Sequence, residues 1–108
     1  MAERVGLNLA SYASAKAALV QLTKSMALEL ARSNIRVNAL APGYILTEIN
    51  QDFFDTEEGQ GYVSKIPMKR LGLESELDGA LLLLASDASS FMTGSVITVD
   101  GGHVINPL

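Results

Sequence analysis

The chain has 108 residues, with 8 Lys and Arg against 12 Asp and Glu, for a net charge of −4. This length predicts one domain at most. An acidic balance without a basic run argues against a nucleic-acid or anionic-membrane surface. The absence of cysteine excludes disulfides, thiolate metal sites and cysteine nucleophiles. With no signal-peptide core at its start and a longest apolar run of only Ala80–Ala85, the chain is expected to be soluble, cytoplasmic and not membrane-spanning.

The first expected element is a long helix from about Leu9 to Arg32, a stretch without Gly or Pro. Asn8 or Ser11 could cap its start, and Asn34 is a plausible left-handed stop. One apolar face carries large residues at helical spacing and a second carries mostly small ones: Leu19, Leu22, Met26 and Leu30, then Ala13, Ala17, Val20, Ala27 and Ala31. A helix apolar on two sides packs on two sides, here on a sheet and on another helix of this chain or of a partner.

The remainder of the chain alternates between strands and helices. A buried strand is expected over 35–41, closed by Pro42-Gly43, and an irregular acidic stretch with short helical pieces at best over 44–72. A second helix should span Glu74–Ser86, with Ser75 as a possible cap and close packing against Gly79. A final strand, Val96–Val99, ends in a turn at 100–102. The fold class is therefore α/β with parallel strands.

This sheet is incomplete as given, because parallel strands need neighbours and cover on both faces. The pattern is typical of the end of a larger doubly wound domain. We therefore expect the isolated chain to aggregate, to associate or to stay partly molten.

The segment Tyr12-Ala13-Ser14-Ala15-Lys16 is the chemically informative one. Residues four apart share a helix face, so Lys16 can place its charge near the phenol of Tyr12. A nearby cation lowers the pKa of a phenol, and Tyr12 could then exchange a proton with an alcohol or carbonyl oxygen. The spacing alone favours an ordinary helix that carries a half-buried Tyr and a solvated Lys.

The context of this segment resembles the short-chain dehydrogenase/reductase family. The resemblance rests on Ser11–Leu19, Leu28–Ala31, Ile35–Gly43, Leu83–Asp87, Thr93-Gly94 and Val99–Gly102, in the family's order and spacing. It covers nearly the whole chain, and the tail resembles bacterial 3-oxoacyl-carrier-protein reductases. It implies that residues 1–108 form the C-terminal part of a single Rossmann-type domain, with a substrate lid at about 44–72.

The resemblance also implies roles for individual residues. Tyr12 would be the proton donor and acceptor and would also contact the cofactor, and Lys16 would lower the Tyr12 pKa and bind the nicotinamide ribose. The backbone of Pro42-Gly43 would border the nicotinamide, the main chain of Ile45 would meet the carboxamide, and the Thr47 hydroxyl would bind the carboxamide or a phosphate. The cofactor would be NAD or NADP, the substrate a small alcohol or ketone, and the assembly a homodimer or homotetramer.

The sequence leaves two interpretations open for each of three features. The apolar lid residues could line a substrate pocket or dock the lid: Phe53, Phe54, Tyr62, Ile66 and Met68. The acidic run from Glu48 to Glu58 is read as a solvated face, with cation binding as the alternative. His103 has no catalytic constellation around it in sequence and is expected to be solvated or packed.

Several family features are absent from these 108 residues. They include the Gly-rich phosphate turn, the residue that separates NAD from NADP, the catalytic Ser and the proton-relay Asn. We therefore expect a piece of a longer protein that is inactive alone. The alternative is a non-catalytic association module or a nonfunctional remnant.

Overall fold

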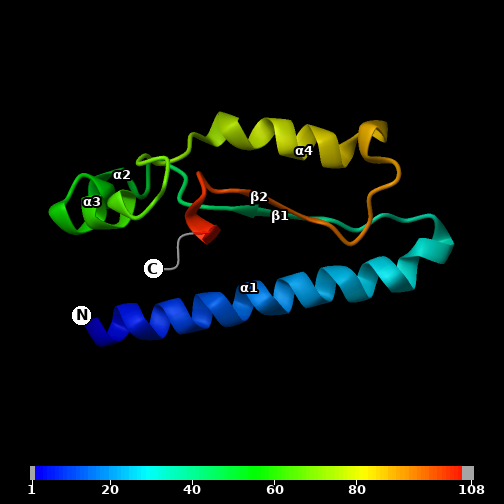
Figure 1. The fold of residues 1–108 in the computed structure, drawn as a ribbon, viewed down its shortest axis with the longest axis horizontal. Helices are drawn as coiled ribbons and strands as arrows, with labels where there is room; N and C mark the ends of the chain where they lie inside the picture. The colour runs from blue at the N-terminus through cyan, green and yellow to red at the C-terminus, as the bar shows by residue number, and fades with distance from the viewer. Residues whose placement is uncertain (1, 106–108) are drawn as a thin grey trace. The chain divides into compact units, whose positions relative to one another are not determined.

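The structure, a computed structural model, describes the backbone of residues 2–105 and the side chains of residues 14–104 (Figure 1). It divides into two compact units. The first unit comprises the residues up to Ala39 together with Ser90–Val96, and the second comprises Leu40–Ser89 and the residues from Ile97 onward.

The first unit is built on one long helix, α1, which spans Ala2–Leu30 and continues as a 3-10 turn, η1, over Ala31–Ser33. The expected start at Leu9 is wrong, so neither Asn8 nor Ser11 is the cap. Ala2, Glu3 and Arg4 are strong helix formers and extend the helix past the single glycine at position 6. The stop at Asn34 is confirmed, since its φ of 59° is left-handed and its N–H donates to Ala31 O.

Among the described side chains of α1, only two are buried, and both are small. Thr23 and Ala27 are each 4% exposed. A Cβ on Gly94, whose φ is +77°, would lie 3.5 Å from the Ala27 Cβ. By contrast Leu19 and Leu22 are half exposed. Within this unit the expected small-residue face is covered at Ala27, whereas Ala17 and Ala31 are exposed.

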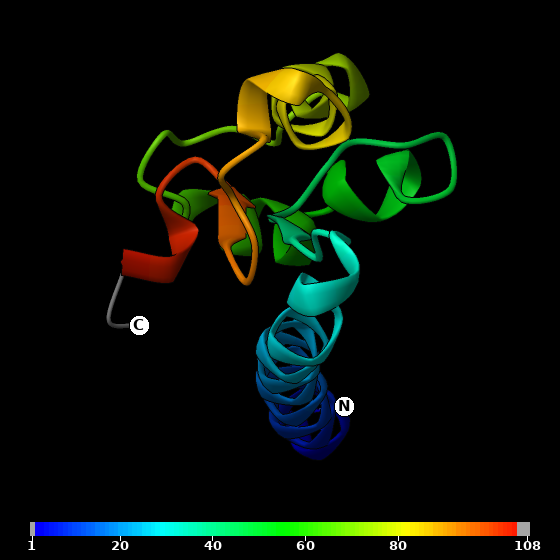
Figure 2. The ribbon, with the colours of Figure 1, turned by 90° about the vertical axis from the view of Figure 1, so that its right-hand side faces the viewer.

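A two-stranded sheet joins β1, Ala39–Pro42, to β2, Val96–Val99, which Figure 2 shows nearly end-on. Ala39 N–H donates to Ser95 O and Gly43 N–H to Val99 O, both at 2.9 Å, and this constant offset makes the strands parallel. The expected α/β class is confirmed, as are the bounds of the second strand.

The first strand begins at Ala39 and not at the expected residue 35. Immediately before it, the side chain of Asn38 makes hydrogen bonds in place of the backbone ladder. Asn38 donates its Nδ2 to Met92 O and accepts from Ser95 N–H, at 3.0 Å each. Asn38 is thus a structural residue of the first unit.

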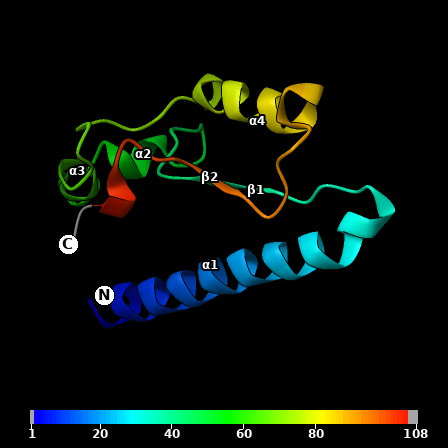
Figure 3. The same ribbon diagram turned by 45° about the vertical axis from the view of Figure 1, so that its right-hand side comes forward.

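The second unit carries the short helices. They are α2 (Gln51–Phe54), α3 (Glu57–Ser64), the 3-10 turn η2 (Glu74–Leu77), α4 (Asp78–Ala85), and the 3-10 turns η3 (Asp87–Ser89) and η4 (His103–Ile105). In Figure 3, α2 and α3 lie side by side, and α4 runs along the strands. The prediction of short helical pieces in 44–72 is confirmed.

Two details of the second helix differ from expectation. Ser75 is not the cap. The segment begins at η2, where the Glu76 carboxylate turns back and accepts from the Leu73 N–H at 2.9 Å. The expected close packing against Gly79 is wrong, because a Cβ built at this position meets no described atom within 4 Å.

We expect Gly79→Ala to stabilise the fold by about 0.5–1 kcal/mol, since alanine lowers the entropy cost of helix formation without a clash. Denaturant titration followed by circular dichroism measures this change. A loss of stability would mean that a surface beyond the described residues covers Gly79.

No helix in the described part of the chain is both long enough and apolar enough to span a membrane.

Candidate functional site

The proposed proton-transfer pair lies on α1. The helix runs without interruption through positions 12 and 16, so the two residues are one turn apart on one face. The side chain of Tyr12 lies outside the described residues. Lys16 is half-buried, and its ammonium forms no salt bridge with a carboxylate among side chains 14–104.

The proposed nicotinamide border begins where β1 ends. Pro42 is the last residue of that strand, and the N–H of the next residue, Gly43, donates a hydrogen bond to Val99 O. A Cβ on Gly43 would come within 2.6 Å of the Asp100 Cβ. Glycine is therefore required here by the close approach of the two strand ends, independently of any ligand.

Ile45 sits in a parallel bridge with Gly72. Gly72 N–H donates to Tyr44 O at 2.9 Å, and Leu46 N–H donates to Gly72 O at 2.8 Å. In this pattern the N–H and C=O of Ile45 itself point away from Gly72. Its C=O accepts from Asn50 Nδ2 at 2.8 Å, whereas its N–H has no partner among the described residues. The backbone of Ile45 therefore offers one open donor.

Thr47 and Asn50 hold the turn that follows. Thr47 N–H donates to Asn50 Oδ1 at 2.8 Å, and Asn50 N–H donates to Thr47 Oγ1 at 3.3 Å. The Thr47 hydroxyl accepts this bond and keeps its own proton for another partner. Sequence reasoning missed Asn50, although Thr-x-x-Asn has the spacing of a capping box and could have revealed it.

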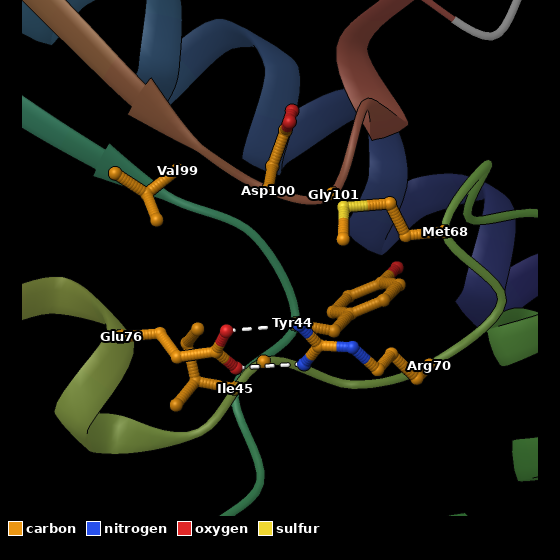
Figure 4. A pocket seen from close by; sticks show the side chains of 9 residues that line it. Tyr44, Ile45, Met68, Arg70, Glu76, Val99, Asp100 and Gly101 are labelled. Atoms are coloured by element: carbon orange, nitrogen blue, oxygen red, sulfur yellow. Dashed lines mark hydrogen bonds and ion pairs between the residues drawn. The ribbon is translucent and has the colours of Figure 1, made fainter.

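A hollow of about 140 Å³ lies in the second unit between the Tyr44–Ile45 segment, the Met68–Gly72 segment and the end of β2 (Figure 4). Its rim carries a bidentate ion pair, in which Arg70 Nη1 and Nη2 lie 2.7 and 2.8 Å from the two carboxylate oxygens of Glu76. The hydrogen bond from Arg70, together with that from the Leu73 N–H, lowers the pKa of the Glu76 carboxyl to about 2. The pair is therefore fully charged throughout the neutral range.

The lid residues divide between the two interpretations. Phe54 and Ile66 are 7% and 1% exposed and pack within the second unit, whereas Met68 lines the hollow. The Tyr44 ring meets Phe54 at 5.8 Å and His103 at 5.1 Å between ring centroids. His103 is thus packed.

The acidic run contributes to helix formation. Glu57 and Glu58 lie in the first turn of α3, where the helix dipole favours negative charge, and the Thr56 side chain caps that helix. Among the described side chains no three potential metal ligands gather. The reading as a solvated face fits these positions.

The site residues named from the sequence fall into two sets. Tyr12 and Lys16 belong to the first unit, and Pro42, Gly43, Ile45 and Thr47 belong to the second. The second unit brings its four residues together in one strand end and the turn that follows.

Residues 1–104 match a family model described as enoyl-(acyl carrier protein) reductase. The chain is 42% identical over 103 residues to 7alpha-hydroxysteroid dehydrogenase of Escherichia coli, covering 95% of this chain and 40% of that protein. It is 45% identical over 95 residues to 3-oxoacyl-[acyl-carrier-protein] reductase FabG of Thermotoga maritima, covering 88% and 38%. The chain therefore spans well under half the length of these curated relatives.

Solved structures agree with the fold. A 4-hydroxyisoleucine dehydrogenase complexed with NADH matches with a TM-score of 0.80 and 36% identity, over 89% of this chain and 40% of that one. A gluconate 5-dehydrogenase from Burkholderia cenocepacia, in complex with NADP and tartrate, matches with a TM-score of 0.78 and 41% identity, over 87% and 37%. The expected Rossmann-type fold and the resemblance to 3-oxoacyl-carrier-protein reductases are confirmed.

Proposed function

Because the chain belongs to the short-chain dehydrogenase/reductase family, we propose that the protein containing it interconverts an alcohol and a ketone by hydride transfer with NAD or NADP. Tyr12 exchanges the proton with the substrate oxygen. The bound cofactor supplies or accepts the hydride, and this chain supplies the proton and part of the cofactor's binding site.

The open N–H of Ile45 is the observation that carries this proposal. An amide oxygen such as that of the nicotinamide carboxamide is a suitable acceptor for this donor. The Thr47 hydroxyl lies two residues further on with its proton uncommitted, and can bind the carboxamide or a phosphate. Pro42 and Gly43 border the same ligand with their backbone. The residues present therefore fit a nicotinamide end.

The proton chemistry rests on α1. An unperturbed phenol ionises near pH 10, which is too high for rapid proton exchange at neutral pH. Lys16, one turn away, places its ammonium where it favours the phenolate form of Tyr12 and lowers that pKa in this scheme. Lys16 also donates to the ribose hydroxyls of the bound cofactor in this scheme.

The names of the relatives set the substrate class broadly. They include a hydroxysteroid dehydrogenase, an oxoacyl reductase and a gluconate dehydrogenase, which share an alcohol or ketone at the reacting carbon. We infer a small-molecule alcohol or ketone as the substrate, and the cytoplasm as the compartment. We infer a homo-oligomer as the assembly, with the exposed Leu19 and Leu22 of α1 in its contacts.

The test is cofactor oxidation or reduction by the intact protein that contains this chain, with panels of ketones, alcohols and enoyl thioesters. We expect ketone turnover, and a fall of roughly 10²-fold in kcat on Lys16→Met, because the phenol then loses its nearby cation. Lys24→Met, an exposed lysine two turns along the same helix, is the matched control and should leave kcat unchanged. Turnover of enoyl thioesters alone would refute the alcohol/ketone assignment.

A non-catalytic association module is the second candidate, favoured by the apolar side chains that α1 and α4 leave exposed. It predicts no turnover in the test above, together with co-purification of a longer homologous chain. Turnover by the intact protein would rule it out as the main function.

A further inference from the structure

We propose that the Arg70–Glu76 ion pair positions the Ile45 N–H for the nicotinamide carboxamide, so that both residues act on the reaction without touching the cofactor. This role rests on the proposed function. The pair acts on Ile45 through the backbone that lies between them.

The pair closes the turn over residues 70–76. Glu76 receives both guanidinium nitrogens of Arg70, and its Oε1 also accepts from the Leu73 N–H at 2.9 Å. Arg70 Nη1 additionally donates to Leu71 O at 3.1 Å. Two of these bonds end on the backbone, on either side of Gly72. The ion pair therefore fixes the backbone around Gly72, as well as joining two side chains.

Gly72 in turn holds the strand end that carries the open donor. Its N–H and C=O bind the residues directly before and after Ile45. A Cβ at position 72 would lie 2.7 Å from the Ile45 Cδ1, so the Ile45 side chain packs directly against Gly72. Asn50 holds the Ile45 C=O from the other side. The orientation of the Ile45 N–H is thus set by Gly72 and Asn50 together.

The side-chain exposures argue against a large role in stability. The two side chains are 48% and 39% exposed, and exposed ion pairs contribute little to folding. A bidentate pair fixes the relative orientation of its two side chains. Small displacements of a positioned hydrogen-bond donor can lower the catalytic rate substantially. Figure 4 shows the pair at the rim of the hollow, beside Tyr44 and Ile45.

The first experiment measures amide hydrogen exchange in the intact protein carrying Arg70→Met or Glu76→Gln. Glu76→Gln keeps an acceptor for the Leu73 N–H, so it is the variant more certain to fold. We expect the amides of Gly72 and Leu46 to exchange roughly tenfold faster. The Gly43 amide in the sheet should keep its wild-type rate. Glu74→Gln, an exposed acid of the same turn, is the control and should change none of these rates.

The second experiment compares kcat/KM for the ordinary cofactor with that for its thionicotinamide analogue, whose sulfur is a weaker acceptor. The ratio of the two values is independent of the fraction of folded enzyme. We expect both variants to lose the wild-type preference for the oxygen cofactor by roughly threefold or more. The Glu74→Gln control should retain that preference.

Unchanged exchange at Gly72 and Leu46, or altered exchange with an unchanged cofactor ratio, would overturn the positioning role. A wild-type protein that binds neither cofactor would refute the proposed function and this role with it. That failure is distinguishable, because it appears in the wild type before any variant is compared.

Discussion

Replacing Tyr12 by Phe in the intact protein should lower kcat by roughly 10²–10⁴-fold, which is the usual contribution of a positioned general acid or base. The substitution removes only the phenolic oxygen and keeps the ring. α1 should therefore remain helical through position 12, where phenylalanine differs little from tyrosine in helix propensity. The substitution leaves the proposed carboxamide contact of Ile45 in place, so cofactor affinity should stay near that of the wild type.

Single-turnover kinetics with a reduced cofactor and a ketone measures this loss, and cofactor fluorescence measures the affinity. Tyr62→Phe is the matched control. Its ring packs on Tyr44 and Phe53, at 6.1 and 5.8 Å between centroids, and no hydrogen bond of its hydroxyl is needed for these contacts. Near-normal turnover of Tyr12→Phe would remove Tyr12 from the mechanism and leave Lys16 without a catalytic partner.

Sequence reasoning located the elements whose residues have strong local conformational preferences. Val96–Val99 is a β-branched run between a glycine and an Asp-Gly-Gly turn, and the strand has those bounds. Asn34 tolerates the left-handed conformation, and the helix ends there. The turn after β2 follows from Gly101 and Gly102, both at positive φ. Local chemistry determines each of these features.

The features that sequence reasoning missed depend on contacts whose residue spacing follows no regular helix or strand period. Gly79 and Gly59 look alike in a sequence, yet one faces open space and the other faces backbone. Arg70 and Glu76 are six residues apart, which is not the spacing of a helical side-chain pair, so the sequence alone does not predict their ion pair. The open donor of Ile45 becomes visible only when the register with Gly72 is known. The Tyr12–Lys16 assignment came from family resemblance and stays a prediction.

The largest stability effect is expected at Gly59, which is buried in α3. A Cβ there would overlap the Phe53 carbonyl oxygen and lie 2.5 Å from the Phe54 Cα, and neither backbone atom can move aside cheaply. We expect Gly59→Ala to destabilise the fold by about 2 kcal/mol or more, because overpacking against backbone exceeds the alanine's gain in helix propensity. α2 and α3 should separate, which exposes Phe54.

Gly61→Ala provides the matched control, because it makes the same substitution two residues along the same helix. A Cβ on Gly61 meets nothing within 4 Å, so this variant should gain about 0.5–1 kcal/mol instead. Denaturant titration of both variants against the wild type gives the two free energies of unfolding. Opposite signs would establish that α3 packs on the end of α2 through Gly59. If both variants were equally stabilised, that close contact would be absent and the docking of the lid through Phe54 would have to be rejected.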